Sequence, residues 1–147
     1  SARERCVWMS TNIKNVNHQF GSEYLSHVDI LPSICTYMNF VIPKDLAFEE
    51  DGISFIGKRD IYDLKTEPYD NLVTLSWKCE NPNQPVHIYM STTNYFKEGK
   101  PDKWIEVGSL FAKEKKCTVD LSKYEKSKIY KFVVVTPNNH LNRWIVK

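Results

Sequence analysis

The chain is 147 residues long, which fits one domain of ordinary size or one domain with an extension. With 41% hydrophobic, 26% charged and 13% aromatic residues, it is neither intrinsically disordered nor collagen-like. The net charge of +2 hides an asymmetry: residues 1–70 carry 7 Lys and Arg against 11 Asp and Glu, whereas residues 71–147 carry 13 against 7. We expect the two halves to neutralise each other on folding, and the alternative is an acidic partner for the second half.

Local patterns exclude membrane insertion of this segment and a nucleic acid partner. The longest aliphatic run, Val133–Val135, is far too short to cross a bilayer. The chain has no extended block of like charges and no RNA-binding motif. It starts at Ser1 without an initiator methionine or an apolar leader, which indicates a processed or excised piece.

The N-terminal part, residues 1–42, is expected to form a strand-containing extension that packs on a following domain. Its two strand-like segments are residues 5–9 and 34–42, and Pro43 marks the boundary. Residues 44–70 are acidic, and they are expected to supply a first strand at residues 53–56 and a long connection.

From residue 71 onward, apolar and polar residues alternate with the period of a half-buried strand. Val73, Leu75, Trp77 and Cys79 share one face of the first such segment. Five further strands are predicted, at residues 86–92, 104–107, 116–121, 129–136 and 141–146. Six short strands separated by turn-forming stretches predict an antiparallel β-sandwich.

The cysteines bear on the cellular compartment. Cys6, Cys35, Cys79 and Cys117 stand far apart, and no pair has the spacing of a zinc site or a redox motif. An even number at long spacings favours two disulfides in an oxidising compartment. The alternative is four reduced thiols in a cytosolic protein.

Part of the chain, about residues 43–147, resembles a fibronectin type III-like domain of the immunoglobulin-like sandwich class. The resemblance is carried by Pro43, Leu46, Leu75-Ser-Trp77, Tyr89, Trp104-Ile-Glu-Val107, Val119-x-Leu121 and Tyr130-x-Phe132-x-Val134. It implies that Trp77, Tyr130 and Phe132 lie in the core. The chain departs from the family between Leu121 and Tyr130, where the corner is three residues longer and lacks Pro and Gly.

The resemblance also implies a disulfide pairing. In a fibronectin-type order the second and fifth strands are neighbours in one sheet, which would bring Cys79 and Cys117 together. Cys6 would then pair with Cys35 and close the extension into a loop.

We expect no catalytic site, no metal and no cofactor. The histidines at positions 18, 27, 87 and 140 lack metal-ligand spacing, and the chain has no G-x-S-x-G, H-E-x-x-H or phosphate-loop motif. The acidic run Glu49-Glu50-Asp51 lacks the alternating oxygen ligands of a calcium loop, so we interpret it as solvated.

One end of the predicted sandwich is the candidate binding surface, because its alternate loops, residues 94–103 and 122–128, should gather there. The partner-binding residues predicted in them are Tyr95, Phe96, Lys97, Lys100, Lys103, Lys123, Tyr124, Lys126 and Lys128. Aromatic residues beside a basic rim suit recognition of a protein or an acidic glycan. The alternative is a lysine-rich, solubilising surface with the aromatic residues packed on the sandwich. The opposite end, with residues 80–84 and 137–142, is a second contact surface to consider.

The resulting functional prediction is a non-catalytic extracellular or secreted module, such as part of a receptor or adhesion ectodomain. Its partner would be another protein: a receptor, a ligand or a neighbouring domain. Most of this follows from the family resemblance. One alternative is a carbohydrate-binding sandwich in which Trp104 and Tyr95 stack on the sugar rings of an acidic glycan. A second is a cytosolic scaffold or enzyme-accessory domain with reduced thiols.

Overall fold

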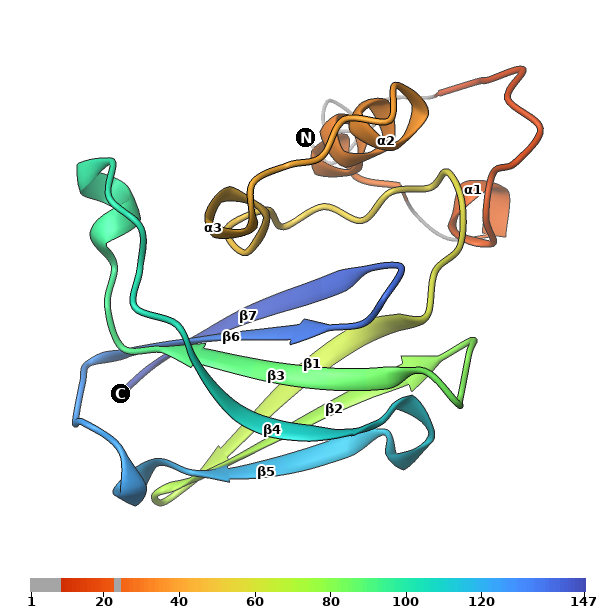
Figure 1. Cartoon of the computed structure of the whole chain (residues 1–147). Helices are drawn as coiled ribbons and strands as arrows, with labels where there is room; N and C mark the ends of the chain where they lie inside the picture. The colour runs from red at the N-terminus through yellow and green to blue at the C-terminus, as the bar shows by residue number, and fades with distance from the viewer. Residues whose placement is uncertain (1–8, 23–24) are drawn as a thin grey trace, which may run out of the picture.

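A computed structural model of the chain describes residues 9–22 and 25–147. Short helices form the N-terminal part and strands form the rest (Figure 1). The α-helices are α1 (Gln19–Ser22), α2 (Ile30–Tyr37) and α3 (Lys44–Ala47), and the 3-10 helices are η2 (His27–Asp29), η3 (Tyr95–Glu98), η4 (Ala112–Glu114) and η5 (Leu121–Lys123). The strands are β1 (Ile61–Tyr69), β2 (Leu72–Cys79), β3 (Pro85–Ser91), β4 (Ile105–Phe111), β5 (Lys116–Asp120), β6 (Ile129–Val135) and β7 (His140–Val146). In the described ranges, no helix is both long and apolar enough to cross a bilayer.

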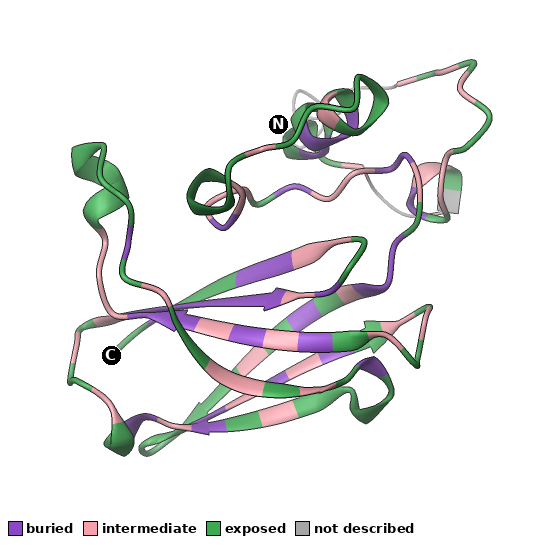
Figure 2. Cartoon of the chain, viewed as in Figure 1, coloured by how far each residue is buried: buried purple, intermediate pink, exposed green. Residues whose placement is uncertain are grey.

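The strands form two antiparallel sheets that pack face to face, so the prediction of an antiparallel β-sandwich is confirmed. One sheet has the order β1-β2-β5 and the other the order β4-β3-β6-β7. Alternate residues of β2, β3 and β6 belong to the core between the sheets. Figure 2 shows purple alternating with pink on β3, whereas β6 is purple along most of its length. Trp77 is 3% exposed, and its Nε1 donates a hydrogen bond of 3.1 Å to the carbonyl oxygen of Ala112. Tyr130 and Phe132 are buried beside it.

The first strand was not placed correctly from the sequence. Residues 53–56 form no strand and contribute one isolated bridge, between Val16 and Ile56. The first strand of the sandwich is β1, an edge strand whose register with β2 shifts between Tyr62 and Lys65. Asp63, inside the shift, has a φ of 55°. This bulge interrupts the alternation by which a strand is recognised in a sequence.

The predicted strand at residues 34–42 is also wrong, because residues 30–37 form helix α2. The Asp29 carboxylate fixes the start of this helical segment, where it accepts the backbone N–H of Ser26 at 2.8 Å and that of Ile53 at 2.8 Å. Pro32 lies in the first turn, where its missing N–H costs nothing. The strand predicted at residues 5–9 falls outside the described residues except for Met9, which lies in no strand.

The segment after α3 covers the outer face of the four-stranded sheet (Figure 1). The ring of Phe48 lies 5.3 Å from that of Tyr89 on β3 and 5.2 Å from that of Trp104. Asn142 of β7 donates hydrogen bonds to the carbonyl oxygens of Phe48 and Glu50, at 3.3 and 3.1 Å. This cover explains why β6 is buried on both faces. Residues 48–50, just after α3, are therefore packed on the sandwich.

Candidate functional site

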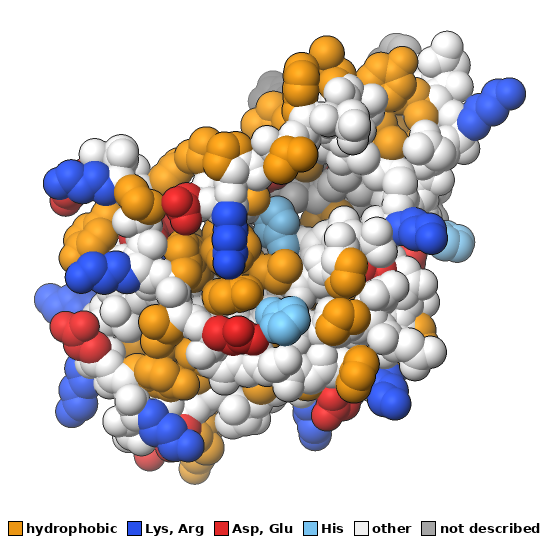
Figure 3. Space-filling model, viewed as in Figure 1, with side chains coloured by type: hydrophobic (Ala, Val, Ile, Leu, Met, Phe, Trp, Pro, Cys, Tyr) orange, Lys and Arg blue, Asp and Glu red, His pale blue; other side chains and the backbone are white. Residues whose placement is uncertain are grey.

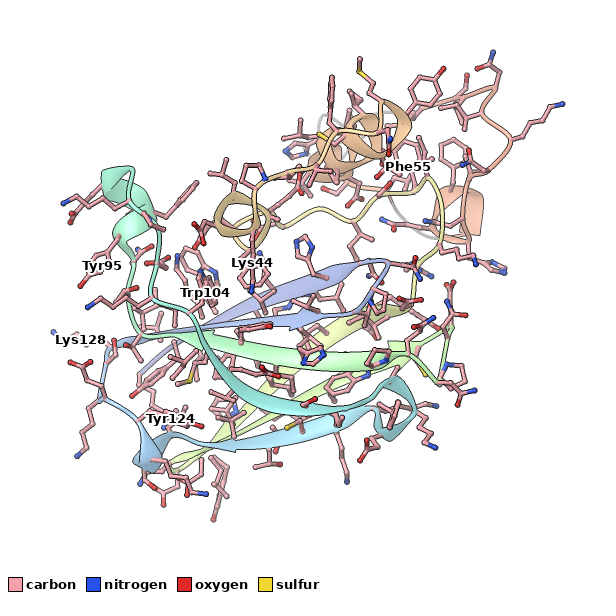
Figure 4. All side chains as sticks on the ribbon, viewed as in Figure 1. Lys44, Phe55, Tyr95, Trp104, Tyr124 and Lys128 are labelled. Carbon is pink, nitrogen blue, oxygen red and sulfur yellow. The ribbon has the colours of Figure 1, made fainter. Side chains whose placement is uncertain are left out.

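The two loops predicted to share one end of the sandwich lie together and enclose a cleft. Ser127 donates its hydroxyl to the carbonyl oxygen of Thr92 at 3.0 Å, which joins the β5–β6 connection to the end of β3. The cleft has a volume of about 510 Å³. Figure 4 shows Tyr95, Tyr124 and Lys128 along this edge of the molecule.

Only some of the predicted partner-binding residues line this cleft, namely Tyr95, Lys103, Tyr124 and Lys126. Lys97, Lys100, Lys123 and Lys128 are exposed around it, and Phe96 lines a separate hollow with Glu49 and Trp144.

Trp104, to which the carbohydrate alternative assigned sugar stacking, lies outside the cleft and is half-buried. It packs edge-on against Phe48, with an interplanar angle of 88°. Figure 4 shows it beneath α3, near Lys44. Its role in the fold is to anchor the N-terminal segment.

A buried group of three charges holds the η3 wall of the cleft in place. The ammonium of Lys131, fully buried on β6, donates to both carboxylate oxygens of Glu49 at 2.8 Å and to Oδ2 of Asp102 at 2.6 Å. Oδ1 of Asp102 in turn accepts the hydroxyl of Thr93 at 2.8 Å and the backbone N–H of Tyr95 at 2.7 Å. We call Glu49, Asp102 and Lys131 the buried triad. The triad joins the segment just after α3, which contains Glu49, to the sandwich and to the cleft.

The triad corrects the expectation of a solvated acidic run, since the Glu49 side chain is only 5% exposed. Burial raises the pKa of Glu49, and the hydrogen bonds from Lys131 do not fully offset it. Burial acts in the same direction on Asp102, but hydrogen bonds from Lys131, Thr93 and the backbone outweigh it and lower the pKa. Burial also raises the pKa of Glu50.

The directions of the pKa shifts predict opposite changes in stability with pH for two variants. A raised pKa in the folded state means that Glu49 stabilises the fold most below about pH 4.5, and that this contribution is lost as the pH rises through the folded pKa. The Glu49→Gln variant should therefore gain stability relative to the wild type as the pH rises from about 4.5. Chemical denaturation across pH 4 to 8 measures this difference.

Asp60 provides the matched control, because burial would raise its pKa but hydrogen bonds from Asn138 and Asn81 lower it. Its contribution is present above about pH 4 and is lost as the pH falls through the folded pKa. The Asp60→Asn variant should therefore lose stability relative to the wild type as the pH rises toward about 4, so its unfolding is measured below about pH 4, outside the range used for Glu49→Gln. A Glu49→Gln difference with the same sign as the Asp60→Asn difference would contradict the assignment.

The structure also presents an apolar surface that the sequence reasoning missed. On α2 and just after it, Ile30, Leu31, Ile34, Tyr37 and Met38 are exposed, and we call them the α2 stripe. Phe40, Val41 and Leu46, also exposed, extend it toward α3. Figure 3 shows hydrophobic side chains gathered over this part of the molecule. The spacing of the stripe is that of one helix face, a signal in the sequence that could have revealed it.

The stripe faces outward because the opposite side of α2 is bound to the chain below it. The Ser33 hydroxyl donates to the Asp29 carbonyl oxygen at 2.6 Å and accepts the backbone N–H of Phe55 at 3.0 Å. Gly52 permits the close approach, since a Cβ atom there would overlap the carbonyl oxygen of Val28. The helix is therefore fixed with its apolar side toward solvent.

The opposite end of the sandwich is occupied by internal hydrogen bonds. Asp60, fully buried, accepts Nδ2 of Asn81 at 2.6 Å and the backbone N–H of Asn138 at 3.0 Å. Asn139 accepts the backbone N–H of Asp60 at 2.8 Å. These asparagines, considered from the sequence as part of a second contact surface, tie together the loops that contain residues 80–84 and 137–142, and Asn138 is exposed.

The predicted Cys79–Cys117 disulfide is not formed. Cys117 lies opposite Leu75 in the β2–β5 register, four residues from Cys79. Four residues of strand span about 13 Å, and a disulfide requires Cα atoms within about 7 Å. Cys35, Cys79 and Cys117 are all free, and Cys6 lies outside the described residues.

Two of the histidines, His87 on β3 and His140 on β7, lie in the four-stranded sheet. His87 contacts Glu106 at 2.7 Å on the sheet surface, and burial lowers the pKa of His140 beneath Phe48. Among the described residues, no group of three or more His, Cys, Asp or Glu could hold a metal ion.

Comparison with known proteins identifies no family. No family model and no curated protein sequence matches the chain. Among solved structures, the chain is similar to the pectate lyase Pel3 from Pectobacterium carotovorum over 57% of its own length, with 24% sequence identity and a TM-score of 0.41. The chain spans 25% of that enzyme. A similarity of this size supports neither a fold nor a function for this chain.

Proposed function

We propose that the protein is a non-catalytic module that binds another protein through the α2 stripe and its extension at Phe40, Val41 and Leu46. The observation that carries this proposal is the exposure of this apolar surface. Leu31 is 61% exposed, Tyr37 67% and Phe40 60%. Single exposed apolar residues are ordinary, but a continuous group marks an interaction surface.

The chemistry of the surface suits a protein partner. Aromatic residues and methionine are enriched in the cores of protein interfaces, and the stripe has both, as Tyr37 and Met38. Charge is scarce between residues 28 and 43, where Asp29 is the one charged residue and is buried. A charged ligand would find little here to bind, so the partner should present an apolar surface of its own.

We further propose that the sandwich is of the fibronectin type III-like kind. Three features support this. The second and fifth strands are neighbours, as the family order requires. Trp77 on β2 is buried in the core, and Tyr130, Phe132 and Val134 of β6 point into the same core.

We propose two alternative locations for the protein, extracellular and cytosolic. An extracellular module is supported by the family resemblance, but no longer by a Cys79–Cys117 disulfide. A cytosolic scaffold is supported by the three free thiols of Cys35, Cys79 and Cys117. Both forms bind a protein. A count of free thiols under denaturing, non-reducing conditions separates them.

The binding proposal predicts the behaviour of a surface variant. A Leu31→Asp, Phe40→Asp double substitution should abolish capture of the partner, with a loss in affinity of at least about a hundredfold, because it places two charges at the centre of an apolar contact. Stability should change by no more than about 1 kcal/mol, since both side chains are exposed. Affinity capture from cell extract and from extracellular medium measures the binding.

The control is Phe111→Asp, which adds a charge at an aromatic residue on β4 that is 50% exposed. We expect the wild type and this control to retain the same partner and the double variant to lose it. Retention by all three proteins, or by none, would contradict the proposal. A concentration-dependent dimer in sedimentation would assign the surface to a second copy of the chain instead.

A further inference from the structure

We propose that the cleft between η3 and the β5–β6 connection binds an acidic sugar unit, a pyranose that carries a carboxylate. This site is separate from the α2 stripe and does not depend on the protein-binding proposal. The two surfaces share no residue.

The size of the cleft suits a small ligand. Its volume of about 510 Å³ lies within the range of ligand pockets, which is roughly 300–1,000 Å³. Its walls come from the end of β3, from η3, from the start of β4 and from the β5–β6 connection. A concave site with four walls can surround one or two sugar rings.

The lining offers the three kinds of contact that an acidic pyranose needs. The ammonium groups of Lys103 and Lys126 can bind the carboxylate. The carboxylate of Glu125, which also lines the cleft, can accept ligand hydroxyls. Tyr95 and Tyr124 offer aromatic surface for the apolar face of the ring.

The walls are held in place before any ligand binds. Asp102 binds the hydroxyl of Thr93 and the backbone N–H of Tyr95, and the buried Lys131 holds Asp102. On the other side, Ser127 donates its backbone N–H to the Tyr130 hydroxyl at 3.0 Å. Tyr124 packs against the hydrophobic core. A preorganised cleft loses little conformational entropy on binding.

This combination favours a sugar over other anions. A bare sulfate or phosphate has no hydroxyl to donate to Glu125 and no apolar face for the tyrosines. An acidic peptide could supply a charge and N–H donors, but its Glu and Asp side chains have no ring face for Tyr95 and Tyr124 to contact. The test therefore includes both as competing ligands.

The experiment measures binding of a glucuronate-containing tetrasaccharide by calorimetry at fixed ionic strength. Its matched ligand is the same tetrasaccharide with the carboxylates reduced to alcohols. We expect the Lys103→Ala, Lys126→Ala double variant to bind the acidic sugar at least tenfold more weakly than the wild type. The control, Lys113→Ala with Lys116→Ala, removes the same charge near the other end of the sandwich and should bind as the wild type does.

Each outcome of the binding experiment either supports or overturns the proposed sugar site. Binding that requires both the carboxylate and the cleft lysines supports the site. The proposal is overturned if the wild type does not bind the sugar or if the reduced sugar binds equally well. Equal losses in the control variant, or equally tight binding of inorganic sulfate or of a Glu- and Asp-rich peptide, would also overturn it. None of these results bears on the α2 stripe, so the two proposals fail separately.

Discussion

Replacing Trp77 by alanine should lower the free energy of unfolding by about 3–5 kcal/mol. The indole is 3% exposed between the two sheets, so its removal leaves a cavity in close-packed surroundings. It also leaves the carbonyl oxygen of Ala112 without its hydrogen bond from Nε1. A domain of ordinary stability has about 5–15 kcal/mol in total, so the variant should melt far below the wild type in thermal and denaturant unfolding.

Two further variants make this prediction informative even where the alanine protein does not fold. Trp77→Phe keeps an aromatic ring but removes the N–H donor, and should cost about 1–3 kcal/mol. Tyr69→Ala, at a side chain that is 82% exposed on β1, should change stability by less than about 0.5 kcal/mol. A Trp77→Ala protein as stable as the Tyr69→Ala protein would show that the strand register is wrong.

The second large effect is expected at Lys131. The Lys131→Met variant should be destabilised by about 3–5 kcal/mol at pH 7, because it leaves the carboxylates of Glu49 and Asp102 buried without their counter-ion. Methionine keeps most of the aliphatic volume, so the loss reports the charge and not a cavity. The loss should be smaller at pH 4.5, where Glu49 takes up a proton more readily. Denaturant unfolding at both pH values measures it.

A double variant tests whether the charge is the cause. Adding Glu49→Gln to Lys131→Met removes one of the two unpaired carboxylates and should restore a substantial part of the lost stability, although the two substitutions are in contact and will not add simply. A double variant less stable than Lys131→Met alone would contradict the description of the triad. So would a Lys131→Met loss of less than about 1 kcal/mol at pH 7.

The strands could be predicted wherever one face of a strand meets the core and the other stays polar. β2 is the clearest example, since Val73, Leu75 and Trp77 are buried and the residues between them are not. β6 was found by its β-branched and aromatic content. The edge strand β1 was missed because the bulge at Asp63 and the proline at position 68 hide its alternation.

The helical stripe was missed for a different reason. A short apolar run with several β-branched residues, as in α2, cannot be distinguished from a strand by composition. Pro32 is compatible with the helix because it lies in the first turn. The helical spacing of Ile30, Ile34 and Tyr37 was present in the sequence, but no packing partner in the sequence indicated which side faces water.

The buried triad could not be found from the sequence. A lysine in an otherwise apolar strand is ordinarily read as facing water. Lys131 is buried because Glu49, 82 residues away in the sequence, and Asp102, 29 residues away, close over it. The cleft was found in part, because the sandwich topology brings alternate loops to one end, but which lysines line it depends on how the triad fixes η3.

The most direct test of the central claim, that the exposed face of α2 is a binding surface, is site-specific photo-crosslinking. A photoreactive phenylalanine analogue is placed at Tyr37 on α2 or, as a matched site, at Tyr69 on β1; both tyrosines are strongly exposed. We expect a crosslinked partner from position 37 and none from position 69. A partner crosslinked from position 69 but not from position 37 would contradict it.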